Sequence, residues 1–326
     1  MRSHRNWRIA WICGLVLCLG ILIAPLAGLT AAPPIEASSE PDIQTSNTIR
    51  VSTNLVTVPV SVTNPEGQSV PDLDIGDFTL EEDGKAEVIS KLTEAGQSSL
   101  QIALLFDLSG SINPRFEFAL QAATRFLEKV WKPGDRISII SFSSQPAVSL
   151  HASEALPEAL QKLRELKPTN GATAFFDAVV LSAQTLRRSA APETRQAAIA
   201  LSDGEDNESR CSVQEAAREV QRSDTVFYSI NPGGASIRLN TISLKGQQIM
   251  ESLAAETGGT AFLSDKAANL DGIFSRIVAE LRAQYLLSYY SSNPRLDGKF
   301  RRITVSMPRN PDLRVRARQG YYAVRK

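Results

Sequence analysis

Short apolar segments alternate with amphipathic segments from Ser99 to Arg282, and this alternation constrains the fold more than any other feature of the chain. It predicts an α/β fold, a doubly wound and mostly parallel sheet with helices on both faces. The predicted strands are Gln101–Phe106, Arg136–Phe142, Gln196–Leu201, Thr225–Ile230 and Thr260–Leu263. The predicted helices are approximately Arg115–Trp131, Glu154–Leu166, Ala174–Arg188, Ser212–Arg222, Gln247–Thr257 and Ala267–Ala283.

The flanks of this α/β unit are patterned as β-structure. Before it, every second residue from Val56 to Val62 is valine, which predicts a half-buried strand, and Pro59 favours a sheet edge because proline cannot donate to the ladder. After it, further strands are predicted at Tyr285–Tyr290, Arg301–Met307 and Leu313–Tyr322. Each flank is too small for its own core, so we predict that residues 49–95 and 283–326 pair into one small all-β sandwich. The α/β unit, residues 99–282, would be inserted in it.

The N-terminus has the layout of an export signal. Arg2, Arg5 and Arg8 precede an uncharged stretch from Ile9 to Ala32, and a Pro, Ser and Glu-rich run follows. We interpret residues 1–32 as a signal peptide or an uncleaved N-terminal anchor, since the stretch is also long enough to span a bilayer, and residues 33–48 as a linker. The rest of the chain is therefore expected outside the cytoplasm, as a periplasmic, secreted or membrane-anchored protein.

Charge and cysteine content narrow the classes of partner. Thirty-five Lys plus Arg balance thirty-five Asp plus Glu, so no net charge attracts nucleic acid, and a membrane is expected only through the N-terminal anchor. Two of the three cysteines, Cys13 and Cys18, lie in the predicted signal. Cys211 is left without a partner for an internal disulfide, and we interpret its thiol as structural or incidental.

Polar side chains follow two of the predicted strands. Asp107, Ser109 and Ser111 come directly after one strand, Asp203 follows another, and Thr173 ends a turn that leads into a helix. Because ligands bind beyond the carboxyl ends of parallel strands, these oxygens are expected at one edge of the sheet. They are hard ligands that suit Mg²⁺, with Mn²⁺ as an alternative, whereas Ca²⁺ normally calls for more oxygens. Uncharged hydroxyl ligands would leave the ion electrophilic toward an added carboxylate.

A purely structural interpretation of the same residues stays open. Asp107 could cap the next helix, the two serines could satisfy backbone donors, and Asp203 with Gly204 could form an ordinary turn. Asp177 is either close to the ion or a helix-start carboxylate favoured by the helix dipole. Three acidic residues follow Asp203, namely Glu205, Asp206 and Glu208. They either tune the affinity for the ion or form a solvated loop.

The residues Asp107-Leu-Ser109-Gly-Ser111, followed by Thr173 and by Asp203-Gly204, resemble the metal-ion-dependent adhesion site of the von Willebrand factor type A domain family, over about residues 99–282. The resemblance implies that the two aspartates frame a divalent ion and that the three hydroxyls complete the set. It also implies that an Asp or Glu of a protein partner fills the last position. The stretch Pro71–Lys85 resembles an exported bacterial group related to this family and described from Acidobacteria, for which no activity is implied.

We expect the protein to be a binding module of the cell envelope. Such a module captures a protein partner without catalysing a reaction on it. The alternatives are a structural or assembly component in which the ion only stabilises the fold and, less favoured, a metal-dependent hydrolase. No catalytic residue is predicted: His151 is the one histidine beyond the signal, and neither a Gly-x-Ser-x-Gly elbow nor a Walker loop occurs.

Two predictions concern the C-terminal flank. The last predicted helix runs into the strand at Tyr285–Tyr290 with almost no linker, so we predict that ligand binding and packing between the two parts are coupled. Arg314, Arg316 and Arg318 alternate along one strand. We interpret them as a solvated face, with binding to an anionic surface as the alternative.

Overall fold

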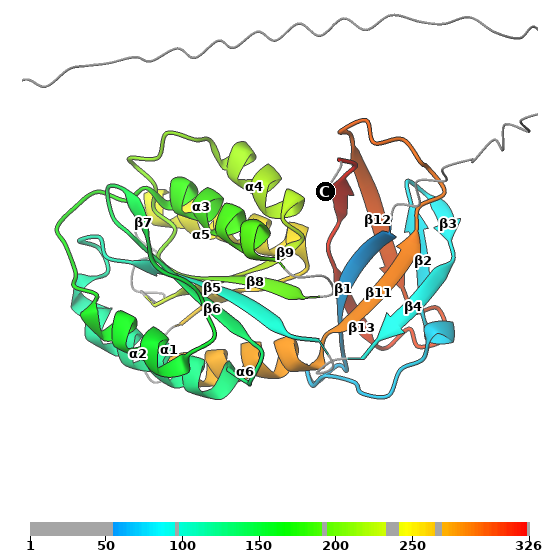
Figure 1. Cartoon of the computed structure of the whole chain (residues 1–326), viewed down its shortest axis with the longest axis horizontal. Coiled ribbons are helices and arrows are strands. Elements are labelled where there is room, and N and C mark those ends of the chain that lie inside the picture. Colours follow the sequence, from blue (N-terminus) through cyan, green and yellow to red (C-terminus); the bar gives the residue numbers. More distant parts are fainter. Residues whose placement is uncertain (1–54, 95–97, 191–193, 233–240, 265–268, 325–326) are drawn as a thin grey trace, which may run out of the picture. The chain divides into compact units, whose positions relative to one another are not determined.

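The structure of the protein is a computed structural model that describes residues 55–94, 98–190, 194–232, 241–264 and 269–324 (Figure 1). The predicted signal or anchor and the predicted linker lie outside these residues, as do residues 49–54 of the first flank. Among the helices in the described ranges, none is both long enough and apolar enough to cross a membrane.

The α/β unit is built on a six-stranded sheet. Its strands follow the spatial order β10 (Ala261–Leu263), β9 (Thr225–Asn231), β8 (Arg195–Leu201), β5 (Leu100–Asp107), β6 (Arg136–Phe142) and β7 (Pro146–Ser153). All neighbours are parallel except β6 and β7. The chain leaves β5 toward β6 and leaves β8 toward β9, in opposite directions, so the strand order reverses between β5 and β8. Such a reversal opens a crevice at the carboxyl ends of the two strands.

Helices cover both faces of this sheet (Figure 1). On one face lie α1 (Phe116–Val130), α2 (Leu156–Glu165) and α6 (Leu270–Ala283), and on the other α3 (Phe175–Ser189), α4 (Val213–Arg222) and α5 (Thr241–Thr257). Alternate residues of β5 enter different cores: Leu104 and Phe106 pack with the first set of helices, Ala103 and Leu105 with the second. Because both of its faces are covered, β5 is apolar without interruption from Ile102 to Phe106, directly before Asp107.

The two flanks form two four-stranded antiparallel sheets. One has the order β13 (Arg314–Ala317), β1 (Leu55–Thr63), β11 (Tyr285–Tyr290) and β4 (Ile89–Thr93); the other has β14 (Gly320–Tyr322), β12 (Phe300–Ser306), β2 (Thr79–Glu82) and β3 (Lys85–Glu87). Short 3₁₀ turns occur at Ile75–Asp77 and Asn113–Arg115. Each sheet combines strands from before and after the α/β unit, and both sheets share one apolar core, here called the β-sandwich. The predicted fold class is confirmed; the predicted domain boundaries stay a prediction.

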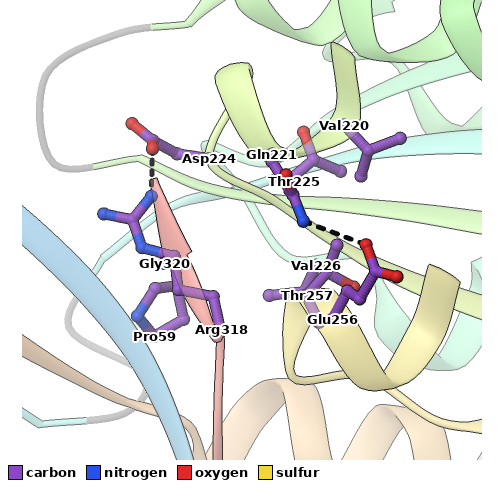
Figure 2. A pocket seen from close by; sticks show the side chains of 10 residues that line it. All are labelled: Pro59, Val220, Gln221, Asp224, Thr225, Val226, Glu256, Thr257, Arg318 and Gly320. Atoms are coloured by element: carbon purple, nitrogen blue, oxygen red, sulfur yellow. Dashed lines mark hydrogen bonds and ion pairs between the residues drawn. The ribbon is translucent and has the colours of Figure 1, made fainter. Parts of the chain in front are cut away.

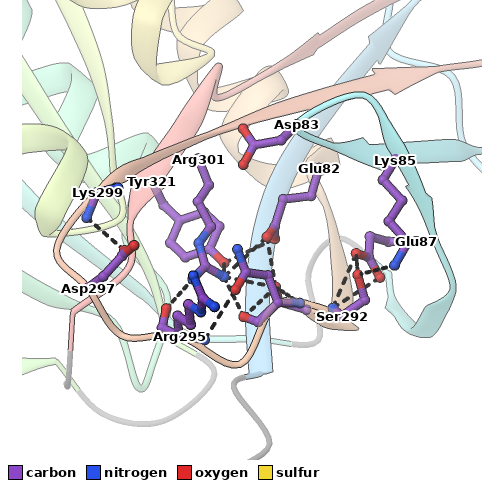
Figure 3. Close-up of polar contacts among 12 residues, drawn as sticks. Glu82, Asp83, Lys85, Glu87, Ser292, Arg295, Asp297, Lys299, Arg301 and Tyr321 are labelled. Atoms are coloured by element: carbon purple, nitrogen blue, oxygen red, sulfur yellow. Dashed lines mark hydrogen bonds and ion pairs between the residues drawn. The ribbon is translucent and has the colours of Figure 1, made fainter.

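A buried ion pair lies in the interior of the β-sandwich (Figure 3). The Arg301 guanidinium lies 3.2 Å from Oε1 of Glu82, and both side chains are almost fully buried. Glu82 also accepts hydrogen bonds from the hydroxyls of Tyr289 at 2.7 Å and Tyr321 at 3.0 Å. Its two oxygens are therefore satisfied by groups from both sheets, which is what a buried carboxylate requires.

Two sequence-based expectations about the strands were wrong, and one strand was missed. The strand β1 is not at an edge, since β11 and β13 pair on its two sides; Pro59 fits because β13 ends opposite Val60. The segment Leu313–Tyr322 is two strands, β13 and β14, which join different sheets. The strand β7 was not predicted. It pairs with β6 with two shifts of register and lies at the edge of the sheet. Its buried and exposed residues therefore do not alternate regularly.

Of the three alternating arginines, Arg314 at the start of β13 is exposed, as the solvated-face interpretation predicts, whereas Arg316 and Arg318, which follows β13, face other parts of the protein. The side chain of Arg318 is buried, pairs with Asp224 and donates to the Thr57 carbonyl at 2.7 Å. Arg316 pairs with Glu280 at 2.5 Å, at the end of α6. Arg316 and Arg318 thus join the β-sandwich to the α/β unit, and this part of the alternating pattern reflects an internal interface.

Candidate metal centre

Two neighbouring strands of the central sheet end in aspartates. Asp107 is the last residue of β5, and Asp203 follows the end of β8 by two residues. The register pairs Phe106 with Leu201, so the chain beyond β8 runs beside Asp107. Both carboxylates are almost completely buried and lie at the point where the strand order reverses. The predicted convergence of these two residues at one edge of the sheet is thus present.

Asp107 is a buried carboxylate held by two neighbours. Its Oδ1 accepts a hydrogen bond from the backbone N–H of Ser109 at 2.9 Å, and its Oδ2 accepts one from the Ser202 hydroxyl at 2.6 Å. Burial raises the pKa of Asp107 to about 6, the bonds from Ser109 and Ser202 oppose the rise, and the negative charge of Asp203 adds to it. A cation between the two carboxylates would relieve this electrostatic penalty.

The second aspartate sits on a sharply turned backbone. Oδ1 of Asp203 accepts a hydrogen bond from the Glu205 N–H at 3.1 Å. Gly204 between them has a φ of 76°, a region that favours glycine, and its N–H donates to the Ser202 hydroxyl at 3.0 Å. Ser202 therefore contacts Asp107 and the turn behind Asp203 at the same time.

The hydroxyl residues reach the same edge by different routes. The hydroxyls of Ser109 and Ser111 lie 3.2 Å apart; Ser109 is buried, whereas Ser111 is exposed. The Gly110 N–H between them donates to the Gly171 carbonyl at 3.5 Å, in the turn that leads to Thr173. Thr173 is thereby tied to the first loop through the backbone, and its own side chain is almost fully buried.

The loop after β8 fixes the backbone of Thr173 through Asn207. The Thr173 N–H donates to the Asn207 side-chain oxygen at 2.8 Å, and the Thr173 carbonyl accepts the Asn207 N–H at 3.0 Å. On its other side, Ala174 donates to the Ser143 carbonyl at 2.7 Å. Among the described contacts, Asp107, Ser109, Ser111 and Asp203 interact through side chains or charge, and Thr173 joins them through backbone contacts.

The rest of this acidic loop caps α3. Asp206 accepts the Phe176 N–H at 3.2 Å, and the Ser209 hydroxyl accepts the Asp177 N–H at 3.1 Å. Asp177 in turn accepts the N–H of Cys211 at 3.0 Å; burial alone would raise its pKa, but the hydrogen bonds from this loop lower it. Of the two interpretations left open for Asp177, these contacts favour the structural one, in which it anchors the loop.

Sequence reasoning missed Ser202 and Asn207. A serine directly before the strand-end aspartate was a usable signal, because a register that pairs Phe106 with Leu201 places Ser202 beside Asp107. For Asn207, the role depends on how the loop folds back over the start of α3, which no local pattern encodes.

The donor set fits a hard divalent cation. It comprises two carboxylates and three hydroxyls, and it lacks the sulfur and imidazole ligands that softer metals prefer. In the described part of the chain there is no group of three or more His, Cys, Asp or Glu residues that could hold a metal. The edge that holds Asp107 and Asp203 has only two such carboxylates, and the neutral oxygens beside them make it the candidate centre.

Several known proteins resemble part of this chain. This chain is 25% identical over 182 residues to calcium-activated chloride channel regulator 1 of Bos taurus. The matched region is 54% of this chain and only 19% of that protein. Among solved structures, it resembles BatB from Bacteroides thetaiotaomicron, with 15% identity, a TM-score of 0.42 and coverage of 55% of this chain and 97% of that chain. It also resembles a structure of proximal thread matrix protein 1 from the mussel byssus in which zinc occupies the metal site. The identity is 15%, the TM-score is 0.46, and the match covers 61% of this chain and 49% of that chain.

The family model for the von Willebrand factor type A domain matches residues 101–276. Domains of this family are generally protein-interaction or adhesion modules, and they typically bind a divalent metal at the site formed by the strand ends. The match begins in β5 and ends in α6, so it spans the six-stranded sheet that carries the candidate centre. Because it covers more than half of the chain, the protein belongs to the von Willebrand factor type A domain family.

Proposed function

We propose that the protein is an extracytoplasmic, cation-dependent module that captures a protein partner. Asp107, Ser109, Ser111, Thr173 and Asp203 hold a Mg²⁺ ion, with Mn²⁺ as an alternative, and thus form a complete metal-ion-dependent adhesion site. An Asp or Glu of the partner completes the coordination. The observation that carries this proposal is the pair of buried carboxylates at the ends of β5 and β8, whose mutual repulsion contributes to the raised pKa of Asp107.

The ligand types support partner capture over tight closure of the site. Three of the five oxygens are uncharged hydroxyls, so two carboxylates would only just neutralise a divalent ion. Ser111 is exposed at the rim, whereas Asp107 and Asp203 are buried beneath it, which leaves the ion accessible from the side of Ser111. A carboxylate from another protein would be the charged ligand that approaches from there.

We further propose that the protein is not an enzyme. The one histidine beyond residue 50, His151, is exposed on β7 at the edge of the sheet. The hydrogen bonds of Asp107 connect it to Ser109 and Ser202, and those of Asp203 to Glu205, which gives no arrangement of nucleophile, base and orienting group. The N-terminal sequence supports export, by a cleaved signal or an anchor.

Capture experiments with matched variants test this function. The immobilised protein without residues 1–50, which contain the predicted signal or anchor and the linker, is exposed to envelope extract with Mg²⁺ or with a chelator. We expect a partner to be retained only with Mg²⁺ and to be lost with Asp107→Ala, while Glu208→Gln removes an equal charge from the neighbouring exposed loop and retains it. Capture that survives both the chelator and Asp107→Ala would favour the alternative, an assembly component in which the ion only stabilises the fold.

A further inference from the structure

We propose that α5 couples the candidate cation site to the β-sandwich, so that occupancy of the site and packing of the β-sandwich influence one another. The inference rests on the proposed cation site and adds its regulation. It is carried by two backbone contacts, one at each end of the helix, both of which require glycine.

The first contact joins α5 to the turn behind Asp203. A Cβ atom at Gly246 of α5 would lie 2.6 Å from the carbonyl carbon of Gly204 and 3.0 Å from the Asp203 carbonyl oxygen. A Cβ atom at Gly204 would lie 2.7 Å from the Gly246 carbonyl oxygen. Any side chain at either position would force the helix and the turn apart. The backbone of α5 therefore packs directly against the turn that contains Asp203 and Gly204.

The second contact joins the end of α5 to the β-sandwich. Gly258 follows the helix with a φ of 82°, and a Cβ there would lie 2.8 Å from the carbonyl carbon of Ala317 in β13. Next to it, the Gln319 N–H donates to the Glu256 carbonyl at 3.0 Å. The twelve residues from Gly246 to Gly258 correspond to about 18 Å of helix, so α5 is a rigid connection between the two contacts.

Two polar contacts lie at the junction beside the second contact (Figure 2). Gln221 at the end of α4 donates to the Glu256 carboxylate at 3.0 Å, and Arg318 of the β-sandwich pairs with Asp224. The cavity that these side chains line has a volume of only about 10 Å³, which is room for no more than a water. A shift at the end of α5 is therefore expected to press on the β-sandwich.

The last helix, for which coupling was predicted from the sequence, is fixed differently. It ends at Ala283 and β11 begins at Tyr285, so the direct connection is present. However, Arg195 donates to the Leu281 carbonyl, and Arg282 pairs with Asp135 and donates to the Val130 carbonyl. These bonds hold the end of α6 against the central sheet and α1, whereas α5 contacts the backbone of the turn formed by Asp203 and Gly204.

Hydrogen exchange of the unaltered protein tests the coupling. The Gln319 N–H is the reporter because it donates across the junction to the Glu256 carbonyl, and the β3 edge strand, Lys85–Glu87, is the control. We expect saturating Mg²⁺ to slow hydrogen exchange in residues 314–320 by threefold or more and to leave exchange in β3 unchanged. In Asp107→Ala, Mg²⁺ is expected to change exchange in neither segment. Exchange in 314–320 that is unchanged while calorimetry records Mg²⁺ binding overturns the coupling alone, and absence of Mg²⁺ binding overturns the proposed function.

A remote variant supplies the reciprocal measurement, because coupling between two sites acts equally in both directions. Gly258→Ala disturbs the junction without touching any candidate ligand, and we expect it to change the Mg²⁺ dissociation constant by threefold or more. Gly272→Ala in α6 is the matched control, since a Cβ there meets nothing within 4 Å. An unchanged dissociation constant in a folded Gly258→Ala protein contradicts the proposal; if this variant does not fold, the exchange measurement decides.

Discussion

The hydroxyl of Ser202 donates a hydrogen bond of 2.6 Å to Oδ2 of Asp107, across the boundary between β8 and β5. The same hydroxyl accepts the Gly204 N–H at 3.0 Å, so one side chain positions the carboxylate of the first strand and the turn of the second. Groups that orient metal ligands in this way commonly contribute a factor of about 10 to 100 to metal affinity. Ser202 is thus the central positioning residue of the candidate metal centre.

Ser202→Ala is therefore expected to weaken Mg²⁺ binding by about tenfold or more while the protein remains folded, as isothermal titration calorimetry would record. The reason is that Oδ2 of Asp107 and the N–H of Gly204 both lose their partner. Ser229→Ala in the neighbouring strand β9 is a matched control, because the buried Ser229 hydroxyl has no hydrogen-bond partner in the described structure. Equal Mg²⁺ affinities for the two variants would remove Ser202 from the site.

Asn207 provides a second positioning prediction. Its side-chain oxygen accepts the Thr173 N–H, so Asn207→Ala is expected to weaken Mg²⁺ binding by about tenfold. Asn207→Asp keeps the accepting oxygen and is expected to restore most of the affinity. If both variants weaken binding equally, the hydrogen bond to Thr173 does not position that ligand.

The ion pair in the β-sandwich yields a stability prediction. Arg301→Met leaves the Glu82 carboxylate buried without its cation, which is expected to lower the free energy of unfolding by about 3 to 5 kcal/mol in urea titrations. Removing both charges with Arg301→Met and Glu82→Gln is expected to recover part of this loss.

The exposed pair of Arg125 with Asp271, at 2.8 Å, is the control for this prediction. Arg125→Met is expected to cost less than about 1 kcal/mol, because both side chains of that pair remain solvated. A loss from Arg301→Met as small as the loss from Arg125→Met would show that the buried pair does not stabilise the β-sandwich.

The thiol of Cys211 gives a pH-dependent prediction. Burial raises its pKa to about 12, and the neighbouring Asp177 carboxylate adds to the shift. Because the thiolate is the reactive form, alkylation by iodoacetamide at pH 8.5 is expected to be at least about 100-fold slower than in urea-unfolded protein, and to accelerate with pH up to about 11.

Asp177→Asn removes the negative charge beside the thiol and should accelerate the reaction severalfold. Mass spectrometry of the peptide that contains Cys211 separates it from the cysteines at 13 and 18. Rapid alkylation of the folded protein at pH 8.5 would contradict the assigned environment of Cys211.

Much of the architecture was predictable because local patterns encode it. Strands β5, β6, β8 and β9 and helices α1 to α4 were placed to within two residues, and in the structure Ser212 is the N-cap of α4, in a capping box with Glu215. The predictions that failed concerned which individual strands lie beside one another within a sheet. Pro59 was assigned to an edge, whereas the sheet places it where β13 has already ended.

The residues of the candidate site also fall into those that the sequence predicts and those that it does not. Strand-end aspartates and hydroxyls could be predicted, because a parallel sheet brings its carboxyl ends together whatever the loops do. Ser202 and Asn207 could not be assigned, because their roles depend on a register and on a loop that folds back. Arg318 was misinterpreted for a related reason: alternation along a strand shows which side chains share a face, but not what covers that face.

Calorimetric titration of Mg²⁺ into the purified protein tests the central claim most directly. The account predicts saturable binding of one ion per molecule, which Asp107→Ala abolishes and Glu208→Gln leaves within about twofold, since Glu208 is exposed beside the site. Absence of Mg²⁺ and Mn²⁺ binding to the folded protein, or equal affinity in the Asp107→Ala variant, would contradict it.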